Sequence, residues 1–297
     1  MRADDAMVAG PAGRGGTPTA VTIDAVSRDL PGWPARLATL VAHQLQSRVR
    51  GTTVWSVSLG LLGVLYVALF PSMSGQIDQY MKALPPEYLD FLGLQGGGMS
   101  TLAGFLDVEQ YSIVAPLALA FLPILLGART IAGAEEARTL DVLLSNPLPR
   151  WIVVASAFLT MLVEVVVIVT VMAVLVGVPA AASGQELAVG RLAAGSLNLV
   201  PFCLFFGGLA LLVSSVVRRP GLAIAVPGAI LVASYILNGL AAAIDRISGL
   251  QRFSIFYHYG SAIQDGMPWG SAAVIFLLAA ALSGLASVGF ARRDIYT

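Results

Sequence analysis

The chain has 297 residues, of which 57% are hydrophobic and only 11% carry a charge. Soluble domains have about 25% charged residues, so this composition excludes a water-soluble globular protein and indicates an integral membrane protein. The formal net charge is +0, which gives no reason to expect nucleic acid as a partner.

The first predicted region, residues 1–32, is rich in Gly, Ala, Pro and Thr. It contains no apolar core of the length that a signal peptide needs. We therefore expect a disordered cytosolic tail, followed by a membrane domain at residues 33–297. The first spanning helix would act as an uncleaved signal anchor.

A predicted amphipathic helix precedes the first span. Its apolar residues recur every four positions and share one helical face. They are Leu37, Val41, Leu45 and Val49. The arginines and glutamines of this segment lie largely elsewhere. This pattern favours a helix lying in the plane of the inner membrane interface. The alternative is an N-terminal extension of the first span.

Six apolar runs follow, each near the length of about 20 residues that a helix needs to cross a bilayer. None shows the alternation of polar and apolar residues that is typical of barrel strands. The sequence therefore predicts an all-α membrane protein with six transmembrane helices. We place the spans at 53–70, 111–131, 151–178, 192–217, 221–244 and 269–290.

Arginine placement predicts the orientation of these spans. Arginines flank the runs at the predicted inner side, and the opposite loops contain few. The inner-side arginines are Arg48, Arg50, Arg138, Arg150, Arg218, Arg219, Arg292 and Arg293. We expect a multi-pass protein of the plasma membrane with both termini in the cytosol. The aromatic-rich outer loop near residues 250–269 would lie amphipathically at the outer interface.

A polar block, GAEEARTLDVLLSNPLPRW at residues 133–151, separates the second and third runs. Two glutamates near its start favour a helix N-terminus, and NPLPR stops the helix. Leu140, Leu143 and Leu144 recur at helical spacing. We predict a short amphipathic cytosolic helix at about 134–145. Its apolar face must contact the membrane, the spans or a partner protein.

This block resembles the cytosolic turn of type-2 ABC transporter permeases. That turn typically reads as a glutamate, Gly-Thr-Leu, an acidic residue, Leu-Leu-Ser/Ala, a proline and Ser-Arg. The matching residues here are Glu136, Thr139, Leu140, Asp141, Leu143, Leu144, Ser145, Pro147 and Arg150. Arg138 stands in place of the usual glycine and Pro149 in place of the serine. Six spans, cytosolic termini, the preceding amphipathic helix and LLVSSVVRRPGLA at 211–223 are also similar to that family.

The resemblance implies that the block is a coupling helix that docks on a separate ATP-binding subunit. It further implies an exporter with two permease chains, identical or different, and two ATPases. The contact residues would be Glu136, Thr139, Leu140, Leu143, Leu144, Pro147 and Arg150. ATP and Mg²⁺ would be bound by the partner, and this chain would hold no cofactor. Arg138 would stiffen the start of the helix and add a charge to the contact.

The chain's own residues argue against ATP hydrolysis. A P-loop requires a lysine after its glycines, and Lys82, in a predicted outer loop, is the single lysine of the sequence. The energy must therefore come from another chain or from an ion gradient. No clustering of Cys and His indicates a metal site, so we expect a transport subunit and not an enzyme.

Glu164 lies inside the third predicted span. An ionised carboxylate there is costly and should face protein or water. It is either a possible intramembrane substrate or proton site, as in a gradient-driven secondary carrier, or a polar contact between helices. A non-transporting membrane scaffold is a further alternative. Because the spans contain few polar groups, a hydrophobic or amphipathic substrate is favoured.

Overall fold

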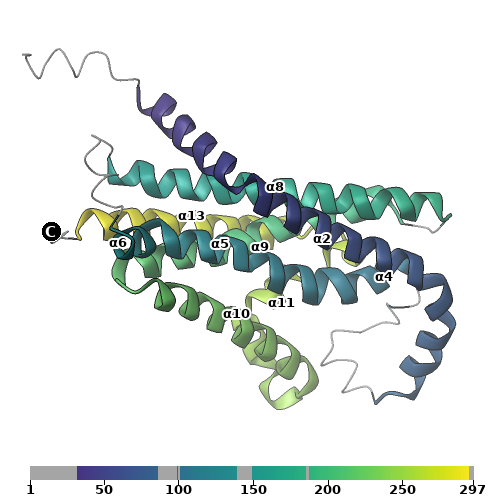
Figure 1. Ribbon diagram of the computed structural model, residues 1–297. Coiled ribbons are helices and arrows are strands. Elements are labelled where there is room, and N and C mark those ends of the chain that lie inside the picture. The colour runs from purple at the N-terminus through teal and green to yellow at the C-terminus, as the bar shows by residue number, and fades with distance from the viewer. Residues whose placement is uncertain (1–31, 86–98, 100, 139–148, 185–186, 294–297) are drawn as a thin grey trace, which may run out of the picture.

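The computed structural model describes residues 32–85, 99, 101–138, 149–184 and 187–293. These residues form a bundle of long helices, and the described part of the chain contains no strand (Figure 1). The predicted N-terminal tail lies outside the described residues except for Gly32.

Six helical stretches are long and apolar enough to cross a membrane, which confirms the six predicted spans. The first, third and fourth spans lie in α2 (Trp33–Ala83), α8 (Arg150–Ala182) and α9 (Val189–Val216). The fifth and sixth are α10 (Pro220–Ala243) and α13 (Trp269–Ala291). The second span joins five elements without a break: α4 (Leu102–Leu106), η2 (Asp107–Val114), α5 (Ala115–Ala128), η3 (Arg129–Gly133) and α6 (Ala134–Glu136).

The predicted interfacial helix before the first span is not a separate element. Residues 33–50 are helical, but they belong to α2, a single helix of 51 residues that is about 77 Å long at 1.5 Å per residue. No proline lies between Pro34 and Pro71 to break it, and its first half is bonded to α8. The alternative, an extension of the first span, is the arrangement that the structure has.

Helix α9 is the centre of the bundle, because it contacts α5, α8, α10 and α13. Of the most apolar 18-residue stretch of α9, 72% is buried, a larger share than in the corresponding stretch of any other described span. Glycines allow this close packing: a Cβ on Gly127 would lie 2.7 Å from the carbonyl oxygen of Gly207, and one on Gly208 would lie 2.7 Å from that of Ala279. Such small residues are typical of helix contacts in membranes.

The segment between α10 and α13, predicted to be amphipathic, consists of three short helices. The short helix η4 (Asp245–Phe253) has no buried residue. In contrast, α11 (Ile255–Tyr259) and α12 (Ala262–Asp265) each bury two residues against the bundle and leave others exposed. Asn198 donates a hydrogen bond of 2.7 Å to the carbonyl of Tyr259, whose hydroxyl donates to the carbonyl of Tyr111. Burial raises the pKa of Tyr259 well above its ordinary value, so the phenol keeps the proton that it donates.

Polar contacts also fix α12 to the start of the second span. The carboxylate of Asp107 in η2 accepts hydrogen bonds of 2.8 Å from the hydroxyl of Ser261 and from the side-chain amide of Gln264. Asp107 is only 4% exposed. Hydrogen bonding of this kind is what lets a carboxylate remain inside a protein.

Candidate functional site

The candidate site lies at the end of the bundle where α8 begins and where α9 and α13 end (Figure 1). The predicted coupling helix, 134–145, starts here. Its first turn, Ala134–Glu136, is helical as α6. Thr139, Leu140, Leu143, Leu144 and Pro147 lie outside the described residues. The start of the predicted helix is therefore described, and so are Pro149 and Arg150 beyond it, whereas residues 139–148 are not.

Arg138 differs from its predicted role. It was expected to stiffen the start of a helix, but α6 ends before it and its φ is 54°. This left-handed conformation costs an L-residue other than Gly, Asn or Asp roughly 1–2 kcal/mol, which is why glycine commonly occupies it. The backbone at this position therefore has a conformation that favours glycine, the residue that the resemblance leads one to expect there.

Arg150, a predicted site residue, is the first residue of α8. Its Nη1 atom donates hydrogen bonds to the carbonyls of Phe290 at 2.8 Å, Ala291 at 3.1 Å and Arg293 at 2.9 Å. The last carbonyls of a helix lack partners within the helix, and a cation there is also favoured by the helix dipole. Arg150 thus fixes the start of α8 to the end of α13.

Glu135 forms the second connection. Its carboxylate is bonded to the guanidinium of Arg293 and lies 3.7 Å from that of Arg218. Arg293 also donates to carbonyls at the end of α9, those of Ser214 at 3.0 Å and Ser215 at 3.4 Å. One guanidinium has five donors and can serve both sets of acceptors. Arg293 therefore joins α6 to the end of α9.

We call Glu135, Arg150, Arg218 and Arg293 the arginine cluster. The family resemblance predicts that Glu136 contacts the ATPase, and Glu136 is exposed in the structure. The neighbouring Glu135 carries the ion pairs instead. The paired arginines at 218–219 and 292–293 were used in the sequence only to orient the spans. One arginine of each pair, Arg218 and Arg293, converges on Glu135, and this required the tertiary arrangement of α9, α13 and the second span.

Glu164, the predicted intramembrane site, lies between α8 and α2. It is 2% exposed, and its carboxylate accepts hydrogen bonds of 3.0 Å from Nε of Arg48 and from the hydroxyl of Thr52. One turn before Arg48 on α2, the side-chain amide of Gln44 accepts a hydrogen bond of 2.8 Å from Thr160 and donates one of 3.2 Å to Ser156, which lie one and two turns before Glu164 on α8. We call these residues the α2–α8 polar ladder.

The ladder favours the second of the two interpretations of Glu164, a polar contact between helices. A carboxylate inside a membrane protein usually pairs with a basic residue or faces water, and Arg48 supplies that pair. In the sequence, Arg48 precedes the first predicted span. It comes beside Glu164 because α2 begins at Trp33, about four turns before Arg48, and packs along α8.

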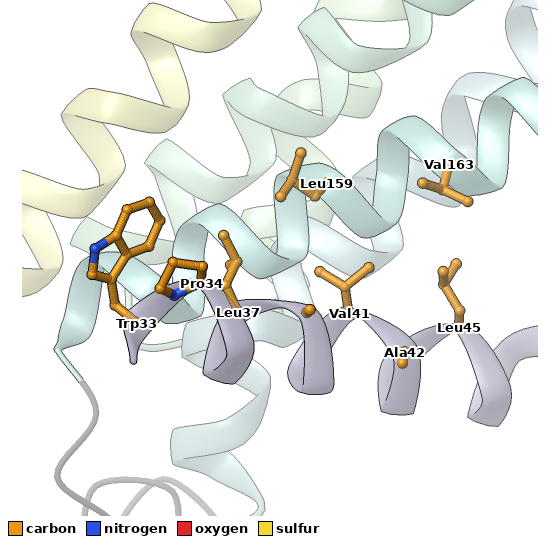
Figure 2. A pocket seen from close by; sticks show the side chains of 9 residues that line it. Trp33, Pro34, Leu37, Val41, Ala42, Leu45, Leu159 and Val163 are labelled. Carbon is orange, nitrogen blue, oxygen red and sulfur yellow. The ribbon is translucent and has the colours of Figure 1, made fainter. Parts of the chain in front are cut away.

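Two apolar grooves lie beside α8. Figure 2 shows the first, of about 430 Å³, into which Leu37, Val41 and Leu45 of α2 point from one side and Leu159 and Val163 of α8 from the other. The second groove, of about 570 Å³, runs between α8 and α9. Both are lined almost entirely by apolar side chains, so they can bind only hydrophobic molecules or the apolar parts of larger ones.

Comparison with known proteins gives one family. The family model described as "ABC-2 family transporter protein" matches residues 38–295, which include all members of the arginine cluster and of the α2–α8 polar ladder. A search of curated proteins finds no match for the chain.

Proposed function

Since the chain belongs to the ABC-2 transporter family, we propose that it is the membrane-spanning permease subunit of an ABC exporter. ATP would be hydrolysed by a separate subunit that binds ATP and Mg²⁺. The permease would act with a second permease chain in the plasma membrane, with both termini in the cytosol.

One observation carries this proposal: the arginine cluster ties residues on both sides of the segment 139–148 to other spans. Glu135, just before the segment, is bonded to Arg293. Arg150, just after it, is bonded to the end of α13. A movement imposed on this segment by a partner would therefore reach α8, α9 and α13 through short polar contacts. This is the arrangement that a coupling segment needs.

Within the proposal, the docking contact consists of side chains at the turn. Glu136 is exposed and can bind a basic group of the ATPase. Thr139, Leu140, Leu143, Leu144 and Pro147 would fill a groove on that subunit. Arg150 would have a different part, because its guanidinium is occupied by the carbonyls of α13. It would hold the segment in place instead of docking.

The substrate class follows from the grooves. The groove of about 570 Å³ between α8 and α9 is lined by valines, alanines and leucines. Its two hydroxyl residues, Thr170 and Ser196, are bonded to Val166 and Tyr111. A polar ligand would find only these two hydroxyls there, both already in hydrogen bonds, whereas the apolar part of an amphipathic molecule would find a matching apolar surface. We therefore propose a hydrophobic or amphipathic substrate.

The test is purification of the tagged full chain from its native host in mild detergent, followed by mass spectrometry. We expect a P-loop ATPase in stoichiometric amount. The double variant Leu143→Asp/Leu144→Asp should lose it, because charges cannot enter an apolar docking groove. Ser145→Asp adds a charge to the same segment at a polar position and should retain it.

The outcomes separate the alternatives. A wild-type preparation without an ATPase would refute the proposal and would favour the alternative of a gradient-driven carrier. An ATPase complex whose hydrolysis and transport never respond to any hydrophobic substrate would indicate a scaffold. Retention of the ATPase by the leucine variant would show that docking occurs elsewhere.

A further inference from the structure

The side chain of Arg293 has an unusual set of partners for a residue at the end of a chain's last helix. Its guanidinium is bonded to Glu135 and to the last carbonyls of α9, including that of Val217 at 3.5 Å. Its own carbonyl accepts a hydrogen bond from Arg150. The backbone and side chain of this one residue thus contact elements on both sides of the segment 139–148.

Burial separates Arg293 from the other arginine that pairs with Glu135. The side chain of Arg293 is 10% exposed, whereas that of Arg218 is 62% exposed. An exposed pair contributes little, typically under 1 kcal/mol, while a buried charge that loses its partner is left unsatisfied at a higher cost. Arg293 is therefore the main partner of Glu135, and Arg218 is peripheral.

We propose that Arg293 is a positioning residue for coupling: its bond to Glu135 transmits displacement of α6 to the ends of α9 and α13. This rests on the proposed function, since it assumes that the segment is moved by an ATPase. In addition to the two spans that the segment connects, the C-terminal end of the sixth span then takes part in coupling.

The chemistry of the side chain makes the assignment specific. A guanidinium presents its donors in a rigid fork, which lets it hold a carboxylate and carbonyls together. The ammonium of lysine is a flexible point charge and cannot hold both sets in fixed geometry. Arg293→Lys should therefore keep the charge and lose part of the coupling.

The experiment is a double-mutant cycle in the complex with the co-purified ATPase. Glu135→Gln, Arg293→Gln and the double variant are compared with Arg292→Gln, which alters the adjacent, exposed arginine. The readouts are the ratio of ATP hydrolysis in the complex to that of the isolated ATPase, the amount of ATPase bound, and the Tm of the permease.

We expect each single variant to lower the hydrolysis ratio at least about five-fold, the lower end of typical coupling between sites. The double variant should be no worse than the more affected single one, because both remove the same contact. Bound ATPase should be unchanged, and Arg292→Gln should match the wild type. Arg293→Lys should lie between wild type and Arg293→Gln.

Other results would overturn the assignment. If the hydrolysis ratio is kept while only Tm falls, Arg293 merely caps α9. If the two losses multiply in the double variant, Glu135 and Arg293 act independently. Both results leave ATPase binding intact and so refute this inference alone, whereas absence of any ATPase in the wild type refutes the proposed function itself. Should Arg293→Gln fail to fold, Arg293→Lys and Glu135→Gln decide the matter.

Discussion

The strongest effect on stability is expected from removing Arg48, because it is the basic partner of a carboxylate buried in the bundle. Arg48→Met keeps the apolar stem and deletes the guanidinium. It leaves Glu164, which is 2% exposed, with the hydroxyl of Thr52 at 3.0 Å as its remaining bond. Breaking a buried ion pair from one side costs about 3–5 kcal/mol.

The reverse deletion should cost less. In Glu164→Met, Arg48 keeps its charge, but its side chain is 23% exposed in the wild type and can extend toward polar surroundings. The double variant Arg48→Met/Glu164→Met removes both charges, and replacing a whole buried pair by apolar residues is often neutral or stabilising. Its stability should therefore lie closer to the wild type than that of Arg48→Met.

The assay is unfolding of the purified chain in mixed micelles, followed by tryptophan fluorescence. Arg50→Met is the matched control, because Arg50 lies two residues further along α2 and is exposed; its effect should be within about 0.5 kcal/mol. Additive losses in the double variant would refute the reasoning, since they would mean that Arg48 and Glu164 do not stabilise each other.

Two further predictions concern glycine geometry and use the same assay. Gly207→Ala should destabilise the protein by about 1–3 kcal/mol, because the new Cβ would lie 2.7 Å from atoms of Met161 and Pro123. Gly228→Ala, where the new Cβ would meet no atom within 4 Å, should stabilise the protein by about 0.5–1 kcal/mol. Equal effects at the two sites would contradict the packing argument. Arg138→Gly should stabilise by about 1 kcal/mol, because φ is 54° there, and a loss of stability would show that the arginine side chain makes a contact of greater value.

The sequence predicted the spans well because the requirement is local. A helix in hydrocarbon must satisfy its own backbone and needs about 20 apolar residues to cross, and both conditions can be read from a single stretch of chain. The six predicted runs accordingly overlap all six apolar helices. The polar block at 133–151 likewise carried the family resemblance, which the family match over residues 38–295 confirms, because its charges, leucines and prolines interrupt two apolar runs.

Partners far apart in the chain were decided by the tertiary structure alone. Glu135 and Arg293 are 158 positions apart, and Arg48 and Glu164 are 116 apart. No local pattern distinguishes Glu135 from Glu136, or indicates that Arg48 lies beside a buried carboxylate. The parallel packing of α2 on α8 and the central place of α9 bring these groups together. Length and hydropathy thus determined which segments cross the membrane, while packing between helices decided which charges pair, because an ion pair depends on distances that the chain order does not contain.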